Sequence, residues 1–270
     1  MKTIFKKILV SFLLLGIVNS GSTQGMPLGK IIVLMTPDFQ KDAKPEALQT
    51  FIRGEIFPMY DQDKPGSNFY LFQADRGDKK GSYLLVCGHK TFANREKMPA
   101  GSPFTNKILS NHASSSKASD FFSNSDTYTE YQLIGSENFQ TLPDVGILGI
   151  HYIKVKKDRS EQFEKFVKEK MHPAVGDLLP DMHLLTYKAT AGDQKGTYIT
   201  IFAITSVQAR DVYWPAGKPE TEILKQSFAP LKKLAGELRG YLAEGSYLEP
   251  TGGAAAIFES KEWTDYIYQK

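Results

Sequence analysis

The sequence predicts an α+β protein built from two tandem β-α-β-β-α-β modules, and three observations lead to this prediction. Residues 43–89 align without gaps on residues 158–204, at an offset of 115, and ten of the 47 positions are identical. Each copy shows the same succession of alternating apolar runs and helical periodicities. The chain also has 13 Tyr and 17 Phe among its 270 residues, which is typical of a packed globular protein. We interpret the alignment as an internal duplication.

Residues 1–24 form a separate segment with the layout of a secretory signal peptide. A short basic region precedes an apolar run from Ile8 to Val18, and small polar residues follow it. The run is shorter than the roughly 20 apolar residues that span a bilayer. We therefore expect cleavage between Ser20 and Gly25 and an exported, soluble chain, periplasmic or extracellular, with no membrane span after cleavage. An uncleaved N-terminal anchor is the alternative.

The charge of the chain gives no indication of nucleic-acid binding. Its 33 Lys and Arg exceed its 30 Asp and Glu, for a formal net charge of +3. Lys2, Lys6 and Lys7 account for the whole excess, and they lie in the expected signal peptide, which has no acidic residue. The rest of the chain is formally neutral, so it lacks the basic surface that a general nucleic-acid binder needs.

The first module is expected to span residues 28–143. Short apolar or alternating runs predict its strands at residues 29–36, 69–74, 82–89 and 128–134. A helix is predicted from Pro45 to Pro58, with Leu48, Phe51 and Ile52 on its apolar face. Residues 110–125 are rich in Ser and Asn, which predicts a short helix or a loop before the fourth strand.

The second module is expected to span residues 144–250 with the same elements. Its strands are predicted at residues 147–155, 182–189, 197–204 and 245–249. Ser160 is the expected N-cap of its first helix, which should stop at Pro173, and a second helix is predicted over residues 220–239. Residues 251–270 form a C-terminal extension that we expect to strap across the protein or to contact a partner chain, which leaves a homodimer open.

The turn between the second and third strands is the most similar part of the two modules. Residues 76–81 read Arg-Gly-Asp-Lys-Lys-Gly, and residues 191–196 read Ala-Gly-Asp-Gln-Lys-Gly. Glycines at these places allow the positive φ angles of a tight hairpin. Because the second copy keeps Gly-Asp but not Arg, we interpret the Arg-Gly-Asp sequence as turn geometry and not as a cell-adhesion signal.

The β-α-β-β-α-β order is that of the split βαβ, or ferredoxin-like, unit. Its sheet carries helices on one face only, and a second copy can cover the bare face to make an eight-stranded barrel with helices outside. In this respect the chain resembles the dimeric α+β barrel superfamily in its tandem, single-chain form. It is similar to exported bacterial proteins with a GDxKGxY hairpin and an aromatic-Pro-x-Gly segment. The resemblance implies a fold and not one activity, because the superfamily includes cofactor-free monooxygenases, haem-dependent peroxidase-like and chlorite-decomposing enzymes, and lactone isomerases.

The third strands indicate which side chains line the barrel. Leu84, Val86, Ile199 and Ile201 form purely aliphatic faces that suit packing under helices, so the mixed, aromatic faces are expected inside. With two residues from neighbouring strands, the predicted lining is Tyr83, Cys87, His89, His151, Tyr187, Tyr198 and Thr200. Such a lining suits an apolar ligand with one or two hydrogen-bonding groups. The alternative is a filled core in which the Tyr hydroxyls are satisfied.

Arg210, Tyr213 and Trp214 complete the candidate site. Trp214 begins a repeated Pro-Ala-Gly segment that could form a lip of the barrel. The alternative is a turn that launches the second helix, with Trp214 packed beneath it. The five His have no spacing typical of a metal site, so we predict neither a metal ion nor a cofactor. A haem would need an axial His near an Arg, for which His172 and Arg210 are the candidates, but no haem motif supports it. Cys87 is the only cysteine, which excludes an intramolecular disulfide.

These observations lead to three hypotheses about function. The first is an exported barrel protein that binds a small apolar or aromatic molecule in the barrel. The second is a cofactor-independent monooxygenase or isomerase, in which Tyr198, His89, Tyr213 and Trp214 would hold a phenolic or enolic substrate. The third is a non-catalytic structural or assembly module with a filled barrel.

Overall fold

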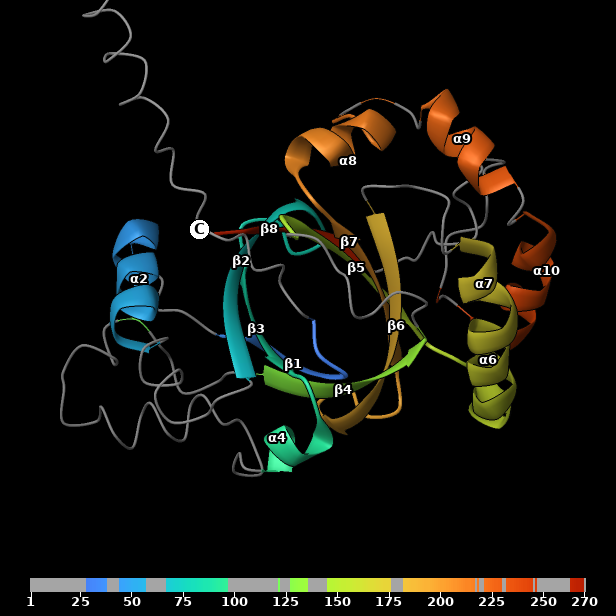
Figure 1. Ribbon diagram of the computed structural model, residues 1–270, viewed down its shortest axis with the longest axis horizontal. Coiled ribbons are helices and arrows are strands. Elements are labelled where there is room, and N and C mark those ends of the chain that lie inside the picture. The colour runs from blue at the N-terminus through green and yellow to red at the C-terminus, as the bar shows by residue number, and fades with distance from the viewer. Residues whose placement is uncertain are drawn as a thin grey trace, which may run out of the picture.

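Eight antiparallel strands close into a barrel with helices on its outside, which confirms the predicted α+β class (Figure 1). The computed structural model describes residues 28–37, 44–56, 67–96, 121, 127–135, 145–175, 182–216, 218, 221–229, 232–244, 246 and 263–269. Below, "first half" denotes the described residues up to Gly135, and "second half" those from Val145 onward.

The elements follow the predicted order in both halves. The first half contains β1 (Ile31–Thr36), α2 (Pro45–Phe51), a π-helix (Ile52–Ile56), β2 (Ser67–Gly77), β3 (Tyr83–His89), α4 (Phe92–Glu96) and β4 (Thr127–Gly135). The second half contains β5 (Ile147–Ile153), a 3-10 turn (Lys157–Arg159), α6 (Ser160–Phe166), a π-helix (Val167–Met171), α7 (His172–Val175), β6 (Met182–Gly192), β7 (Tyr198–Ile204), α8 (Val207–Tyr213), α9 (Glu222–Phe228), α10 (Lys232–Tyr241) and β8 (Trp263–Tyr268).

The strand order around the barrel is the same in each half. The closed order is β1-β3-β2-β8-β5-β7-β6-β4, so each half contributes its strands in the order fourth, first, third, second. The halves meet at two seams, where β2 pairs with β8 and β4 pairs with β6. Helices α6 to α10 lie outside the second half, and α2 and α4 lie outside the first (Figure 1).

The prediction for the fourth strand of the second half was wrong. Residues 263–268 form β8, which lies between β2 and β5 and completes the barrel, so this segment is not a strap over its outside. Of the predicted strand at 245–249, only Ser246 lies within the described residues, where it forms a bend. β8 can fill this place because Thr264 and Tyr266 alternate with outward-facing residues, as the pleat of a barrel strand requires.

Several helix boundaries also differ from the predictions. Ser160 begins α6 and is not its N-cap, which is Arg159 without a side-chain cap bond. Pro173 lies inside α7 and does not end the helix. The preceding π-helix explains this. The backbone N–H of His172 donates to the carbonyl of Val167, five residues earlier, so the i to i−4 hydrogen bonding is already interrupted before Pro173. Proline, which has no N–H to donate, is tolerated at such a place. The predicted second helix is divided into α9 and α10, with α8 before them.

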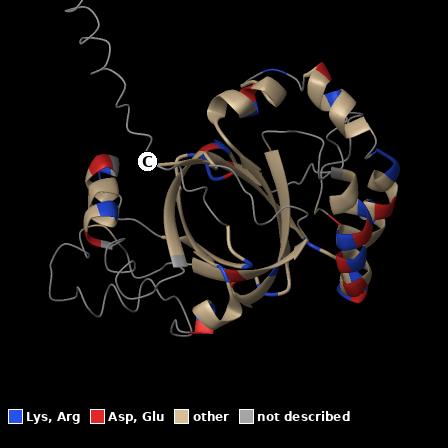
Figure 2. Ribbon diagram, viewed as in Figure 1, with Lys and Arg blue, Asp and Glu red and all other residues tan. Residues whose placement is uncertain are grey.

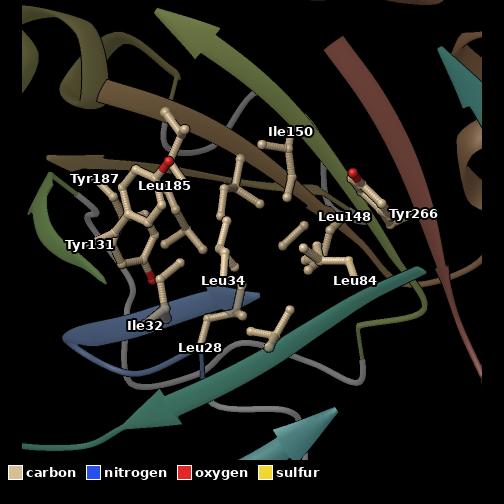
Figure 3. Close-up of a cluster of buried hydrophobic side chains, with 14 of the residues drawn as sticks. Leu28, Ile32, Leu34, Leu84, Tyr131, Leu148, Ile150, Leu185, Tyr187 and Tyr266 are labelled. Atoms are coloured by element: carbon tan, nitrogen blue, oxygen red, sulfur yellow. The ribbon is translucent and has the colours of Figure 1, made fainter. Parts of the chain in front are cut away.

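The interior of the barrel is a packed apolar core. Side chains from all eight strands form it, and none of the helices that the structure describes contributes a side chain. Figure 3 shows Leu34, Leu84, Leu148, Ile150 and Leu185 meeting at its centre. The fold alone accounts for such a core, because the inward residues of a small barrel fill it.

Charged residues lie mostly on the outer helices and turns, whereas the barrel strands carry few of them (Figure 2). Among the described residues, no helix is long and apolar enough to cross a membrane.

Candidate functional site

The faces of the strands are the reverse of those predicted. Tyr83 and Cys87 pack with α2 outside the first half, and Tyr198 packs with α6 outside the second. Leu84 and Ile199, which were expected under the helices, lie inside the barrel. The physical reason is that every residue of β3 and β7 is buried, so the alternation of side chains along these strands does not mark the inner face.

Tyr187 is the candidate that does lie inside the barrel. Its hydroxyl donates to the carbonyl oxygen of Gly29 at 3.1 Å, and its burial raises the pKa of the phenol. The other interior tyrosines, Tyr131 and Tyr266, are also buried among aliphatic side chains (Figure 3). The rings of these three residues are part of the apolar core of the barrel.

A line of four polar side chains crosses the outer face of the second half, between the sheet and its helices. It consists of His151 on β5, Thr200 on β7, Thr186 on β6 and His172 on α7, and we call it the polar strip. His151 pairs with Thr200, and Thr200 pairs with Thr186, so the three are cross-strand neighbours on one face. Cβ atoms of such neighbours lie about 4.5–5.5 Å apart, which brings their polar groups within one small area.

The hydrogen bonds of the polar strip are incomplete. Nε2 of His172 lies 3.0 Å from Oγ1 of Thr186, and both residues are buried. Thr200 is only 1% exposed, yet its Oγ1 has no hydrogen-bond partner. A buried hydroxyl without a partner costs roughly 1–3 kcal/mol. The strip therefore contains an unused donor and acceptor at its centre.

The first half has no such strip, although its strands pair in the same way. Met35 pairs with Leu85, and Leu85 pairs with Leu71, at the positions that His151, Thr200 and Thr186 occupy in the second half. These three residues belong to an ordinary apolar cluster under α2. The fold is therefore formed with apolar side chains here, and the polar residues of the second half are not required by it.

Two features position His172 at its end of the strip. The π-helix before it shifts the helix by part of a turn, and the last residue of β4, Gly135, leaves space for the imidazole. A Cβ atom on Gly135 would lie 2.6 Å from Cδ2 of His172 and 2.8 Å from Cγ1 of Val167. Since Gly135 pairs with Thr186, the first half supplies a wall of a site in the second half.

The pKa of each histidine of the strip is shifted in favour of the neutral imidazole. Desolvation lowers the pKa of His151 to about 4 and that of His172 to about 4, from a usual value of 6.5. A neutral imidazole has one N–H donor and one nitrogen acceptor. At neutral pH the strip therefore offers hydrogen bonds of both kinds without a positive charge.

Aromatic rings surround the His151 end of the strip. The His151 ring lies 5.3 Å from the Phe202 ring, edge to face, and 6.3 Å from the Trp263 ring, nearly parallel to it. Trp214 packs edge-on to Phe202 at 6.0 Å. His151, Trp263 and Trp214 are each partly exposed, so the strip reaches the surface at this end.

Tyr198 lies next to the strip but is engaged with charged residues. Its hydroxyl donates to Glu164 at 2.9 Å, and Nζ of Lys188 donates to the same carboxylate oxygen at 2.7 Å. Burial raises the pKa of Tyr198, and Glu164 acts in the same direction. Tyr198 precedes Thr200 by two residues on the same face of β7, so this charge-paired group borders the strip.

Arg210 is a buried side chain in a partly exposed ion cluster at the β2–β8 seam. Its guanidinium contacts Asp75 at 2.9 Å, Asp211 at 3.1 Å and Asp265 at 3.5 Å. Arg76 contacts Asp211 at 2.9 Å and donates to the carbonyl of Trp214. The cluster fastens α8 of the second half to β2 of the first.

The other seam has a related ion pair, between Arg95 of α4 and Glu130 of β4. Arg95 and Arg210 are separated by the repeat offset of 115, so the two pairs are counterparts. This symmetry favours a structural role for Arg210. Arg210 lies at the β2–β8 seam, whereas His172 contacts Thr186 of β6. The two candidates for haem binding are therefore not brought together, and the residues do not fit a haem site of this kind.

The remaining candidates do not meet the polar strip. Tyr213 is buried in the core under the second-half helices. Cys87 and His89 lie in the first half, where Sγ and Nε2 are 3.4 Å apart, and both residues are fully buried. His89 lies on β3 of the first half and Tyr198 on β7 of the second, so the structure does not bring them into one cluster. Within the described residues, no group of three or more His, Cys, Asp or Glu is arranged to hold a metal ion.

The sequence prediction missed Thr186, Glu164 and Asp265. A comparison of the two copies contains the signal for Thr186 and for Thr200, because polar residues there replace Leu71 and Leu85. The signal for Asp265 is a second repeat, in which Tyr-Thr-Glu-Tyr at 128–131 matches Trp-Thr-Asp-Tyr at 263–266. Its offset is 135 and not 115, which concealed it.

Comparisons with known proteins find likeness only among solved structures. No protein-family model matches the chain, and no curated protein matches it. A proposed monooxygenase from Lactobacillus acidophilus is 12% identical, with a TM-score of 0.48, and the match covers 88% of this chain and 93% of that one. A proposed monooxygenase from Fusobacterium nucleatum is 9% identical, with a TM-score of 0.49 and coverages of 89% and 92%.

A chlorite dismutase mutant from Candidatus Nitrospira defluvii is 10% identical, with a TM-score of 0.45 and coverages of 90% and 92%. At such identities and TM-scores the likeness carries no information about the activity of this chain.

Proposed function

We propose that the chain is an exported member of the dimeric α+β barrel superfamily that binds a small, largely apolar or aromatic molecule against the polar strip. In this proposal residues 1–24 are a signal peptide, residues 28–143 are one ferredoxin-like module, and the second module runs from residue 144 through β8. The site lies between sheet and helices and not inside the barrel, because the barrel interior is a packed core.

One observation carries this proposal: the second half has hydrogen-bonding side chains where the first half has Met35, Leu85 and Leu71. Buried polar groups reduce stability unless they are paired, and Thr200 is unpaired. A bound molecule with a hydroxyl or carbonyl group would pair with it. The aromatic rings around His151 provide the apolar, flat surroundings that such a molecule needs.

Ligand binding can be tested by giving the second half the residues of the first. The purified mature chain and the double variant Thr186→Leu/Thr200→Leu would be screened against small aromatic compounds by thermal shift and native mass spectrometry. We expect the wild type to bind at least one compound class and the double variant to lose that binding while it remains folded. Equal binding by the two proteins would contradict the proposal.

A matched control is available on the same strand. Thr190 lies on the same face of β6 as Thr186, but its hydroxyl contacts Glu130 at the seam. Thr190→Leu is therefore expected to leave binding unchanged. Gly135→Ala tests the site from another side, because the added methyl group would displace the His172 imidazole and weaken binding without altering either threonine.

A catalytic role as a monooxygenase or isomerase is a second candidate, and one observation favours it. The Tyr198 hydroxyl and the Glu164 carboxylate form a proton-donating and proton-accepting pair directly beside the strip. Oxygen uptake and substrate turnover would be measured with wild type, Glu164→Gln and Tyr198→Phe. Loss of turnover in both variants, with ligand binding retained, would support catalysis, whereas unchanged turnover would exclude these residues.

A further inference from the structure

The polar strip contains no ionisable side chain that is charged at neutral pH. Its members are two threonines and two histidines, and burial holds the pKa of each imidazole at about 4. The apolar cluster that surrounds the strip consists of hydrophobic side chains from the second-half strands and helices. A charged ligand would therefore lose its hydration here without gaining an opposite charge.

The charged groups that border the strip are already paired. On one side Lys188 donates to Glu164 at 2.7 Å, and Tyr198 donates to the same carboxylate. On the other side Asp265, two residues from Trp263 on β8, is held by Arg210. An incoming anion or cation would have to break one of these pairs to obtain a partner.

The cluster around Arg210 further disfavours an anion. Its two guanidiniums face three carboxylates, those of Asp75, Asp211 and Asp265, so it has no spare positive charge. In contrast, a hydroxyl or carbonyl group needs only a donor or an acceptor. Thr200 and the Thr186–His172 pair supply both kinds of hydrogen bond.

From this arrangement we infer that the site selects uncharged aromatic molecules that carry a hydroxyl or carbonyl group, and rejects carboxylates and ammonium ions of the same size. This inference rests on the proposed function, because it assumes that the strip binds a ligand. It names a property of that ligand, its charge, which the fold does not determine.

Two matched series of probes test the inference. One comprises 2-naphthol, 2-naphthoate, 2-naphthylmethylammonium and naphthalene, and the other comprises phenol, benzoate, benzylammonium and benzene. Each would be titrated into the mature wild-type chain at pH 7 by calorimetry. We expect the neutral hydroxy compound of at least one series, 2-naphthol or phenol, to bind at least tenfold more tightly than both of its charged analogues.

The threonine variants assign the discrimination to the strip. Thr200→Val and Thr186→Val should each weaken the binding of the hydroxy compound several-fold. Each should leave the affinity for the unsubstituted hydrocarbon within twofold of the wild-type value. Binding of a carboxylate or an ammonium probe as tight as that of the hydroxy compound would overturn the inference and leave the proposed function standing. A failure of all eight probes to bind would overturn both.

Discussion

Asp78 and Trp263 exchange two hydrogen bonds across the seam between the halves. The backbone N–H of Asp78 donates to the carbonyl of Trp263 at 3.0 Å, and the backbone N–H of Trp263 donates to Oδ2 of Asp78 at 3.0 Å. Asp193 and Tyr128 make the same exchange at the other seam, at 3.0 and 2.9 Å. The Gly-Asp turn of each half is therefore hydrogen-bonded to the fourth strand of the other half. This contact explains why both copies retain the Gly-Asp sequence.

Removal of either aspartate is expected to loosen one seam. Asp78→Ala and Asp193→Ala each delete an acceptor for a backbone N–H at the start of a strand, so each should lower the unfolding free energy by about 1–2 kcal/mol. Urea unfolding would measure the change. Lys80→Ala, an exposed change in the same turn as Asp78, is the control and should stay within about 0.5 kcal/mol of wild type.

The turn glycines should differ in their tolerance of a side chain. Gly77 and Gly81 both have positive φ, at 93° and 88°. A Cβ atom on Gly77 would lie 2.2 Å from the Trp263 carbonyl oxygen. A Cβ atom on Gly81 would have no neighbouring heavy atom within 4 Å. Gly81→Ala should cost about 1–2 kcal/mol through backbone strain, and Gly77→Ala clearly more. Equal losses in thermal unfolding would show that the close contact is not rigid.

The two threonines of the polar strip should respond in opposite directions. Thr200→Val removes a buried hydroxyl that has no partner, so the unfolding free energy should rise by about 1 kcal/mol. Thr186→Val leaves the buried His172 imidazole without its partner and should lower it by about 1–2 kcal/mol. Chemical denaturation of the ligand-free proteins would distinguish these outcomes, and two changes of the same sign would refute the hydrogen-bond pattern of the strip.

The β2–β8 seam should make stability depend on pH. Desolvation raises the pKa of Asp265 to about 6 from 3.8, although Arg210 opposes the shift. Because the folded-state pKa is raised, the protonated carboxyl favours folding below pH 4, and that contribution is lost as the pH rises through about 6. Relative to Asp265→Asn, the wild type should therefore lose roughly 1–3 kcal/mol between pH 4 and pH 7. A difference that stays constant with pH would show that Asp265 is ionised throughout.

The element order could be predicted from the sequence because both copies repeat it. Seven of the eight strands occupy their predicted places, from Ile31–Thr36 to Tyr198–Ile204, and the four turn glycines have the expected positive φ. The face that each strand turns inward could not be predicted. In β3 and β7 both faces are buried, so alternation does not identify the inner one.

The candidate site was less predictable for the same reason. His151 and Thr200 could be recognised as candidates from the sequence, but they lie outside the barrel and not inside it. Their role depends on Thr186 and His172, which other elements bring to them. The π-helix at Val167–Met171, which positions His172, has no turn or cap residue that marks it in the sequence. The approach of these four side chains depends on the register of the strands and on the rotation of the helix about its axis. Neither can be derived from a single sequence.

The position of β8 has a consequence for how the protein is made. Every other strand precedes β8 in the chain, yet β8 pairs with β2 on one side and β5 on the other. Until residues 263–268 emerge, both neighbours present unpaired backbone edges, and such edges recruit other chains. Synthesis of the polypeptide therefore passes through an interval in which nearly complete molecules are prone to aggregate, and premature termination before residue 263 would make that interval permanent.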